Sequence, residues 1–134
     1  MELVILDYCD FYYKNIAKTV SPPVRSGKFV QIISTETEYL ILSPKLFSPY
    51  HADIVERFCI NKEIDGVYDK GKYIYIIHDP SWKIIGGGRW LMDDTSRILN
   101  LFDHSQAYGR FDSTGLMEKI RSDGRFSGYT INIE

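Results

Sequence analysis

The sequence predicts an α+β fold, with a mostly antiparallel or mixed sheet of about six strands and two helices packed on it. Tyrosine supplies 10 of the 134 residues, and most apolar stretches are short, β-branched or aromatic, and bounded by Gly, Pro or Asp, as is typical of strands. Only two segments place apolar residues at helical spacing. With 44% hydrophobic residues, the chain fits a single domain, residues 1–134, with one core.

The predicted strands follow the apolar runs. In residues 28–34 the side chains of odd and even positions are expected to point to opposite faces of a strand, and one face is expected to be better buried than the other. Gly71 can take the positive φ of a hairpin turn, so residues 66–79 are predicted to fold back around it. The predicted strands are 2–7, 28–34 pairing with 38–43, the two halves of 66–79, 81–92 pairing with 96–103, and 125–134.

Two helices interrupt the strands. Residues 52–60 and 112–121 each carry one apolar stripe. Asp112 or Ser113 is expected to be the N-cap of the second helix, and Gly124 to end it. The stripes consist of Ile54, Val55, Phe58 and Cys59 in the first helix, and of Leu116, Met117 and Ile120 in the second.

Charge and composition argue against several classes of protein. The 16 basic and 18 acidic residues nearly cancel, and no run of Lys or Arg resembles a nucleic-acid-binding surface. The apolar run between Glu2 and Asp7 is too short for a signal peptide or a membrane span. Cys9 and Cys59 lack CxxC spacing and are expected to be buried thiols. We therefore expect a cytoplasmic monomer that binds neither nucleic acid nor membrane.

His51 is the first candidate for chemistry. It lies at the start of the first predicted helix, where the helix dipole disfavours imidazolium. A neutral imidazole has one nitrogen free to accept a proton, which suits a general base, and the unpaired N–H groups of a helix start favour an anion nearby. The alternative is a capping or core histidine held by a backbone hydrogen bond.

Each of the three histidines has an aspartate nearby, which raises the question of a metal site. The spacing argues against one, because His78 and Asp79 would point to opposite faces of a strand, and the chain has no HExxH motif and no Cys cluster. We expect no metal and no cofactor.

The glycine-rich stretch IIGGGRW, residues 84–90, lacks the GxxxxGK[ST] pattern of phosphate loops. Its glycines lie inside a strand pattern, which predicts a bulge or the close approach of another backbone. Arg89 follows them and has an uncluttered path to a carboxylate or phosphate, while a surface arginine is an equally good interpretation.

The stretch FDHSQAYGRF, residues 102–111, leaves a strand and enters a turn of small residues. Ser105, Ala107 and Gly109 would let consecutive backbone N–H groups face one point, forming an anion-binding nest with the Ser105 hydroxyl beside it. The alternative is an ordinary loop between a strand and a helix.

Three of these stretches, in this order, resemble the protein phosphohistidine phosphatase (janus/ocnus) family. They are YHADI (50–54), GGGR (86–89) and HSQAYG (104–109), and EKI (118–120) and KFVQII (28–33) also look like the family's sequence. The resemblance covers about three quarters of the chain.

The resemblance implies a metal-independent phosphatase acting on phosphoramidates, most of all on protein phosphohistidine. It implies that His51 is the catalytic proton acceptor and that residues 105–107 hold phosphate through backbone amides and the serine hydroxyl. The partner would be a phosphorylated protein or a small phosphoramidate. The residues implied to bind substrate or phosphate are Lys28, Ser105, Gln106, Ala107, Arg89 and Tyr50.

The chain departs from the family pattern in three places. The family usually has an arginine shortly before its Tyr-His pair, where Lys45 is the only nearby cation here, and animal members have a second histidine where this chain has Ser113. The segment between His51 and the glycines is longer by roughly a dozen residues, which accommodates the hairpin around Gly71. A binding module that keeps the phosphate site without turnover is the alternative function.

Overall fold

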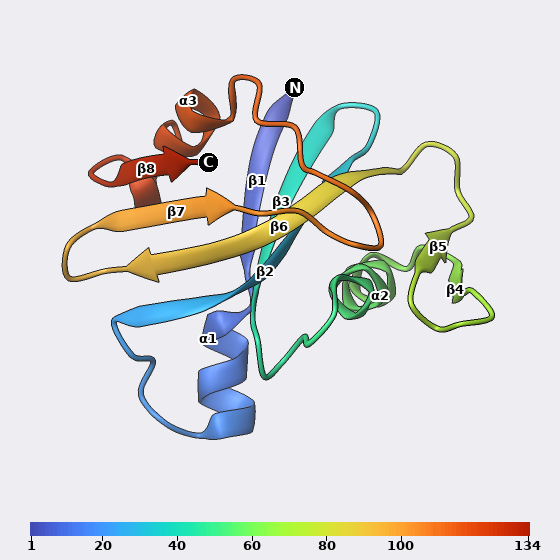
Figure 1. Cartoon of the computed structure of the whole chain (residues 1–134), viewed down its shortest axis with the longest axis horizontal. Helices are drawn as coiled ribbons and strands as arrows, with labels where there is room; N and C mark the ends of the chain where they lie inside the picture. Colours follow the sequence, from blue (N-terminus) through green and yellow to red (C-terminus); the bar gives the residue numbers. More distant parts are fainter.

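The computed structural model describes residues 1–134, and its architecture is α+β, as predicted (Figure 1). A mixed sheet of six strands has the order β1-β3-β2-β6-β7-β8. Its inner pairs are antiparallel, whereas the edge strands β1 and β8 run parallel to their neighbours β3 and β7. The strands are β1 (Glu2–Asp7), β2 (Val24–Ile33), β3 (Thr37–Pro44), β6 (Lys83–Asp93), β7 (Ile98–Phe102) and β8 (Thr130–Ile133).

The predicted hairpin forms a second, two-stranded sheet of its own. Strand β4 (Gly66–Tyr68) pairs antiparallel with β5 (Tyr75–Ile77). Figure 1 shows this hairpin beyond helix α2 (His51–Lys62), away from the six-stranded sheet. The predicted pairings of 28–34 with 38–43 and of 81–92 with 96–103 are confirmed as β2 with β3 and β6 with β7.

The sheet is buried on both faces, so the expectation of one better-buried face and one core is wrong. In β2 the consecutive residues Phe29, Val30, Gln31 and Ile32 are all buried. Phe29 belongs to an apolar cluster that includes residues of helix α3 (Leu116–Arg121), whereas Val30 belongs to a cluster that includes residues of α2. Because successive strand side chains point to opposite faces, helices on both sides bury both sets.

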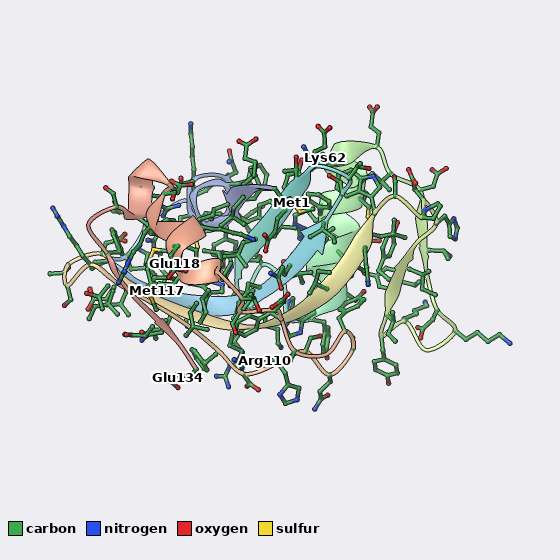
Figure 2. All side chains as sticks on the ribbon, turned by 90° about the horizontal axis from the view of Figure 1, so that it is seen from above. Met1, Lys62, Arg110, Met117, Glu118 and Glu134 are labelled. Atoms are coloured by element: carbon green, nitrogen blue, oxygen red, sulfur yellow. The ribbon has the colours of Figure 1, made fainter.

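Helices α3 and α2 lie apart in the view from above. Figure 2 shows α3, marked by Met117 and Glu118, at the left and the end of α2, marked by Lys62, right of centre. None of the helices is long and apolar enough to cross a membrane.

Helix α3 is shorter than the sequence pattern predicts, and the predicted N-cap is wrong. The N-cap is Gly115, in the left-handed region with φ 66°, and neither Asp112 nor Ser113. The Asp112 carboxylate instead accepts a hydrogen bond from the Thr114 N–H at 3.0 Å, which forms a turn before the helix. The helix ends at Arg121, before Gly124.

The sequence pattern does not predict a third helical segment that the structure contains. Helix α1 (Cys9–Phe11) continues as a π-helical segment, Tyr12–Ala17, and ends at Lys18 in the left-handed conformation. Its aromatic residues are favoured in strands, so propensity gives the opposite indication. Tertiary packing decides, because the rings of Tyr8, Phe11 and Tyr12 lie 5.6 to 6.3 Å from the ring of Phe47.

Candidate functional site

A pocket of about 670 Å³ lies where α2 begins, beside β2 and β6 and the loop after β7. Six of the seven predicted site residues line it, although they come from four separate parts of the chain. Ser105, the seventh, does not line the pocket. The lining residues are Lys28, Tyr50, His51, Tyr73, Ile74, Arg89, Asp103, His104, Gln106 and Ala107.

Strand register and one helix start bring these residues together. Lys28 of β2 is paired directly with Arg89 of β6, so their backbones are neighbours in the sheet. Tyr50 is the N-cap of α2 and His51 its first residue. The Asp53 carboxylate accepts a hydrogen bond from the Tyr50 N–H at 2.9 Å, which fixes the direction in which the helix leaves.

The His51 ring is buried and is oriented by the backbone of β6. Only 7% of the residue is exposed, and Nε2 lies 2.9 Å from the carbonyl oxygen of Gly88. Because a carbonyl can only accept, Nε2 carries the proton and donates it, and Nδ1 is left as the nitrogen with a free lone pair. The ring is thus held by a backbone hydrogen bond, as one of the two interpretations requires, and it also lines the pocket. The role of general base stays a prediction.

Burial lowers the pKa of His51 below its ordinary value. The hydrogen bond to Gly88 opposes this effect, the Lys28 charge lowers the pKa further, and Asp103 raises it. The ring is neutral at pH 7, as the sequence predicts. Burial is the largest cause of this lowering of the pKa, and it acts in the same direction as the helix dipole that the sequence argument invoked.

We expect NMR titration of the His51 ring protons to give a midpoint below the ordinary histidine value of about 6.5. The folded state then binds fewer protons than the unfolded state between the two pKa values. The neutral ring therefore contributes stability above about pH 6.5, and this contribution is lost as the pH falls toward the folded-state pKa. His51→Gln removes this part of the pH dependence of the urea midpoint. A midpoint above 6.5 would contradict the assignment.

The three glycines make room for this arrangement, and the predicted close approach of another backbone is confirmed. A Cβ on Gly86 would lie 2.3 Å from the carbonyl oxygen of Arg110, and one on Gly88 would lie 2.5 Å from that of Phe102. A Cβ on Gly87 would lie 2.8 Å from Cδ2 of His51. The glycine strip, residues 86–88, therefore leaves room for close backbone approach, and at Gly87 for the His51 ring.

Two cationic side chains border the pocket, and neither forms a tight ion pair within the protein. Lys28 Nζ donates a hydrogen bond to the Pro49 carbonyl at 2.6 Å, which leaves two of its three N–H groups for a ligand. Arg89 lies 3.5 Å from the carboxylate of Asp103, and 58% of its side chain is exposed. Such an exposed, long contact is weak, so the guanidinium can turn to an anion.

The loop after β7 carries two unpaired backbone N–H groups on residues that line the pocket. Ser105 and Gly109 exchange two backbone hydrogen bonds, and Gly109 takes a φ of 83° to close the turn. Between them, the N–H groups of Gln106 and Ala107 donate to no protein acceptor. This leaves two adjacent donors beside the pocket, as an anion-binding nest requires.

Ser105 has a different position from the one expected. Its residue is 1% exposed, and its hydroxyl oxygen accepts a hydrogen bond from the Tyr108 N–H at 3.0 Å. The hydroxyl thus fixes the turn that carries the free N–H groups and does not itself line the pocket.

Four lining residues were not among the predicted site residues: Tyr73, Ile74, Asp103 and His104. The Asp103 carboxylate accepts from the His104 N–H at 2.9 Å, and this bond is the first cause that lowers the pKa of Asp103. Asp103 adjoins Phe102, the cross-strand partner of Arg89, so a correct strand register would have revealed it. Tyr73 and Ile74 come from the separate hairpin, and no sequence signal linked them to the site.

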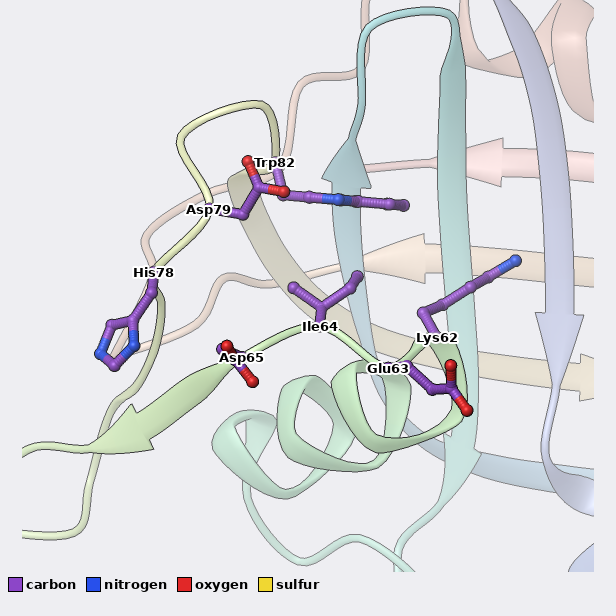
Figure 3. Close-up of a pocket in the computed structure, with 7 residues that line it drawn as sticks. All are labelled: Lys62, Glu63, Ile64, Asp65, His78, Asp79 and Trp82. Carbon is purple, nitrogen blue, oxygen red and sulfur yellow. The ribbon is translucent and has the colours of Figure 1, made fainter.

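Two of the three histidines, His51 and His104, line the candidate pocket, whereas His78 does not. His78 lines a different pocket of about 500 Å³, where its ring and the Asp79 carboxylate extend in different directions (Figure 3). The Asp79 carboxylate accepts hydrogen bonds from the N–H and hydroxyl of Ser81. No group of three or more His, Cys, Asp or Glu residues is placed to hold a metal ion.

A scan against protein-family models gives no match to this chain, and neither does a search of curated proteins.

Proposed function

We propose that the protein is a cytoplasmic, metal-independent phosphatase that hydrolyses phosphoramidates, most of all protein phosphohistidine. One observation carries the proposal: a neutral histidine with a free Nδ1 lines the same pocket as two cations and the residues of two unpaired backbone N–H groups. The motifs that resemble the phosphohistidine phosphatase family supply these same residues.

The phosphoryl group would bind between the donors. Its three oxygens carry the negative charge that Lys28 and Arg89 neutralise, and the N–H groups of Gln106 and Ala107 donate to the same oxygens. Donors held in place before the substrate arrives need no reorganisation when charge develops during the reaction.

His51 would then act as a general base through Nδ1. It takes a proton from water as the water oxygen bonds to phosphorus and the P–N bond breaks; the imidazole leaving group takes a proton from solvent, and His51 then returns its own proton to solvent. The products are the unmodified histidine side chain of the substrate and inorganic phosphate. Direct attack of Nδ1 on phosphorus is the other route, and it would pass through a phosphorylated His51.

The proposal is tested by incubating the protein with a phosphohistidine peptide in excess EDTA. We expect release of inorganic phosphate at a rate proportional to protein concentration and unchanged by the chelator. Phosphoserine peptide serves as the matched control for substrate class. The absence of phosphate release, or its loss on chelation, would contradict the proposed activity.

A phosphate-binding module without turnover is the second candidate, and one observation favours it. Lys45, the only cation near the position where the family has an arginine, lines other pockets and not this one. The pocket therefore has one cation fewer than the family pattern. This candidate predicts that a phosphopeptide binds in calorimetry while no phosphate is released over hours.

A further inference from the structure

The turn of the β4–β5 hairpin forms one wall of the pocket. Tyr73 and Ile74 line it, together with the residues that offer phosphate donors. These two side chains and Tyr50 are the large apolar surfaces of the pocket, whereas its charged and N–H donors come from β2, β6 and the loop after β7. The pocket thus combines phosphate donors from β2, β6 and the loop after β7 with an apolar wall, Tyr73 and Ile74, from the hairpin.

The hairpin is held to the helix that carries His51. The Tyr68 ring packs edge-on against Tyr75, with 5.1 Å between ring centroids. The Tyr68 hydroxyl donates to the Glu56 carboxylate of α2 at 3.1 Å. The two strands of the hairpin therefore do not move freely relative to α2.

The hairpin is also held to the loop with the free N–H groups. The Tyr108 hydroxyl accepts from the Tyr75 N–H at 2.7 Å and donates to the Tyr75 carbonyl at 2.8 Å. Burial raises the pKa of Tyr108 to about 12, so the hydroxyl keeps the proton that it donates. The Tyr108 side chain thus joins the loop after β7 to β5.

Within the turn, Asp69 fixes the backbone that carries Tyr73. Its carboxylate accepts from the Tyr73 N–H at 3.1 Å and from the Ile74 N–H at 3.4 Å. The Tyr73 side chain itself makes no hydrogen bond, and the residue is 74% exposed. An exposed ring on a fixed backbone at the rim of a pocket is a contact surface for a flat ligand.

We propose that Tyr73 is a specificity-determining residue that binds the leaving group of the substrate. This inference rests on the phosphate site of the proposed function. With the phosphoryl group held by these donors, the group attached to it meets the hairpin wall of the same pocket. A flat nitrogen heterocycle such as imidazole packs against the Tyr73 ring, whereas the alkyl amine of phospholysine or the amine of phosphoramidate offers no face.

The test measures binding by calorimetry, so that it does not depend on turnover. The probes are a peptide with a non-hydrolysable phosphoryl-triazole analogue of phosphohistidine, and inorganic phosphate. We expect Tyr73→Ala to weaken peptide binding about 3- to 10-fold and to leave phosphate binding unchanged. Tyr73→Phe retains the ring and the affinity. Val67→Ala, at an exposed position of the same hairpin outside the pocket, is the matched control.

Peptide affinity unchanged in Tyr73→Ala would overturn the inference, as would an equal loss for peptide and phosphate. Phosphate release from a phosphohistidine peptide is followed in parallel. Binding that depends on Tyr73 without any phosphate release supports the inference and contradicts the phosphatase. Phosphate release at the same rate in the wild type and in Tyr73→Ala, with unchanged peptide affinity, supports the phosphatase and contradicts the inference.

Discussion

Replacing His51 by alanine is expected to lower turnover of a phosphohistidine peptide by about 100- to 10,000-fold, the usual contribution of a general base. The reason is the position of Nδ1: the ring is neutral and has its other nitrogen engaged with Gly88, so the free lone pair has no competing proton. The measurement is release of inorganic phosphate at saturating peptide. Peptide binding is expected to change much less, because the phosphate donors remain.

His51→Gln is the matched variant for this prediction. Its amide can still donate to the Gly88 carbonyl and fills most of the space of the ring, but it offers no base of suitable pKa. It should fold with a melting temperature near that of the wild type and show the same loss of turnover. Retention of wild-type turnover by either variant would exclude the proposed role of His51.

The phosphorylation state of His51 during turnover distinguishes the two routes to phosphate release. If Nδ1 attacks phosphorus, rapid quenching at alkaline pH should trap a phosphoryl group on His51, because phosphohistidine is stable to base and labile to acid. If Nδ1 activates water, no phosphorylated protein should accumulate at any time. The two outcomes differ in which bond to phosphorus forms first.

Much of the fold could be predicted because local pattern and tertiary environment agree there. The helix after His51 and the antiparallel pairs follow from apolar periodicity and alternation. The hairpin forms as predicted, but the positive φ of its turn falls on Lys72, at 60°, and not on Gly71 as expected. The segment after Tyr8 could not be predicted, since its aromatic residues favour a strand and become helical only through packing on Phe47. A local pattern contains no information about such a distant partner.

The site shows the same division between local and distant information. Lys28 and Arg89 are far apart in sequence, and only the β2–β6 register places them side by side. The motifs identified them through resemblance, whereas spacing alone did not. Tyr73 lies in a segment that the family pattern lacks, so neither motif nor periodicity could relate it to His51. Its position depends on the hydrogen bonds between Tyr108 and Tyr75.

Gly87→Ala is expected to destabilise the fold and to reduce turnover together. The added Cβ would lie 2.5 Å from the Phe29 carbonyl oxygen and 2.8 Å from Cδ2 of His51, so a strand or the ring must move. Overpacking of this kind costs about 1–3 kcal/mol. Alanine also suits a strand interior better than glycine, but that gain is only about 0.5–1 kcal/mol, so the clash prevails.

Turnover should fall by more than the stability loss explains, because His51 is one of the two groups that must shift. A displacement of about 1 Å at a reacting group can lower the rate about 100-fold. The measurements are the free energy of unfolding in urea and turnover at a temperature where the variant is fully folded. Gly124→Ala is the control, since a Cβ there meets nothing within 4 Å, so turnover should stay unchanged and stability should not fall. A Gly87→Ala protein with wild-type stability and turnover would show that the glycine strip does not position His51.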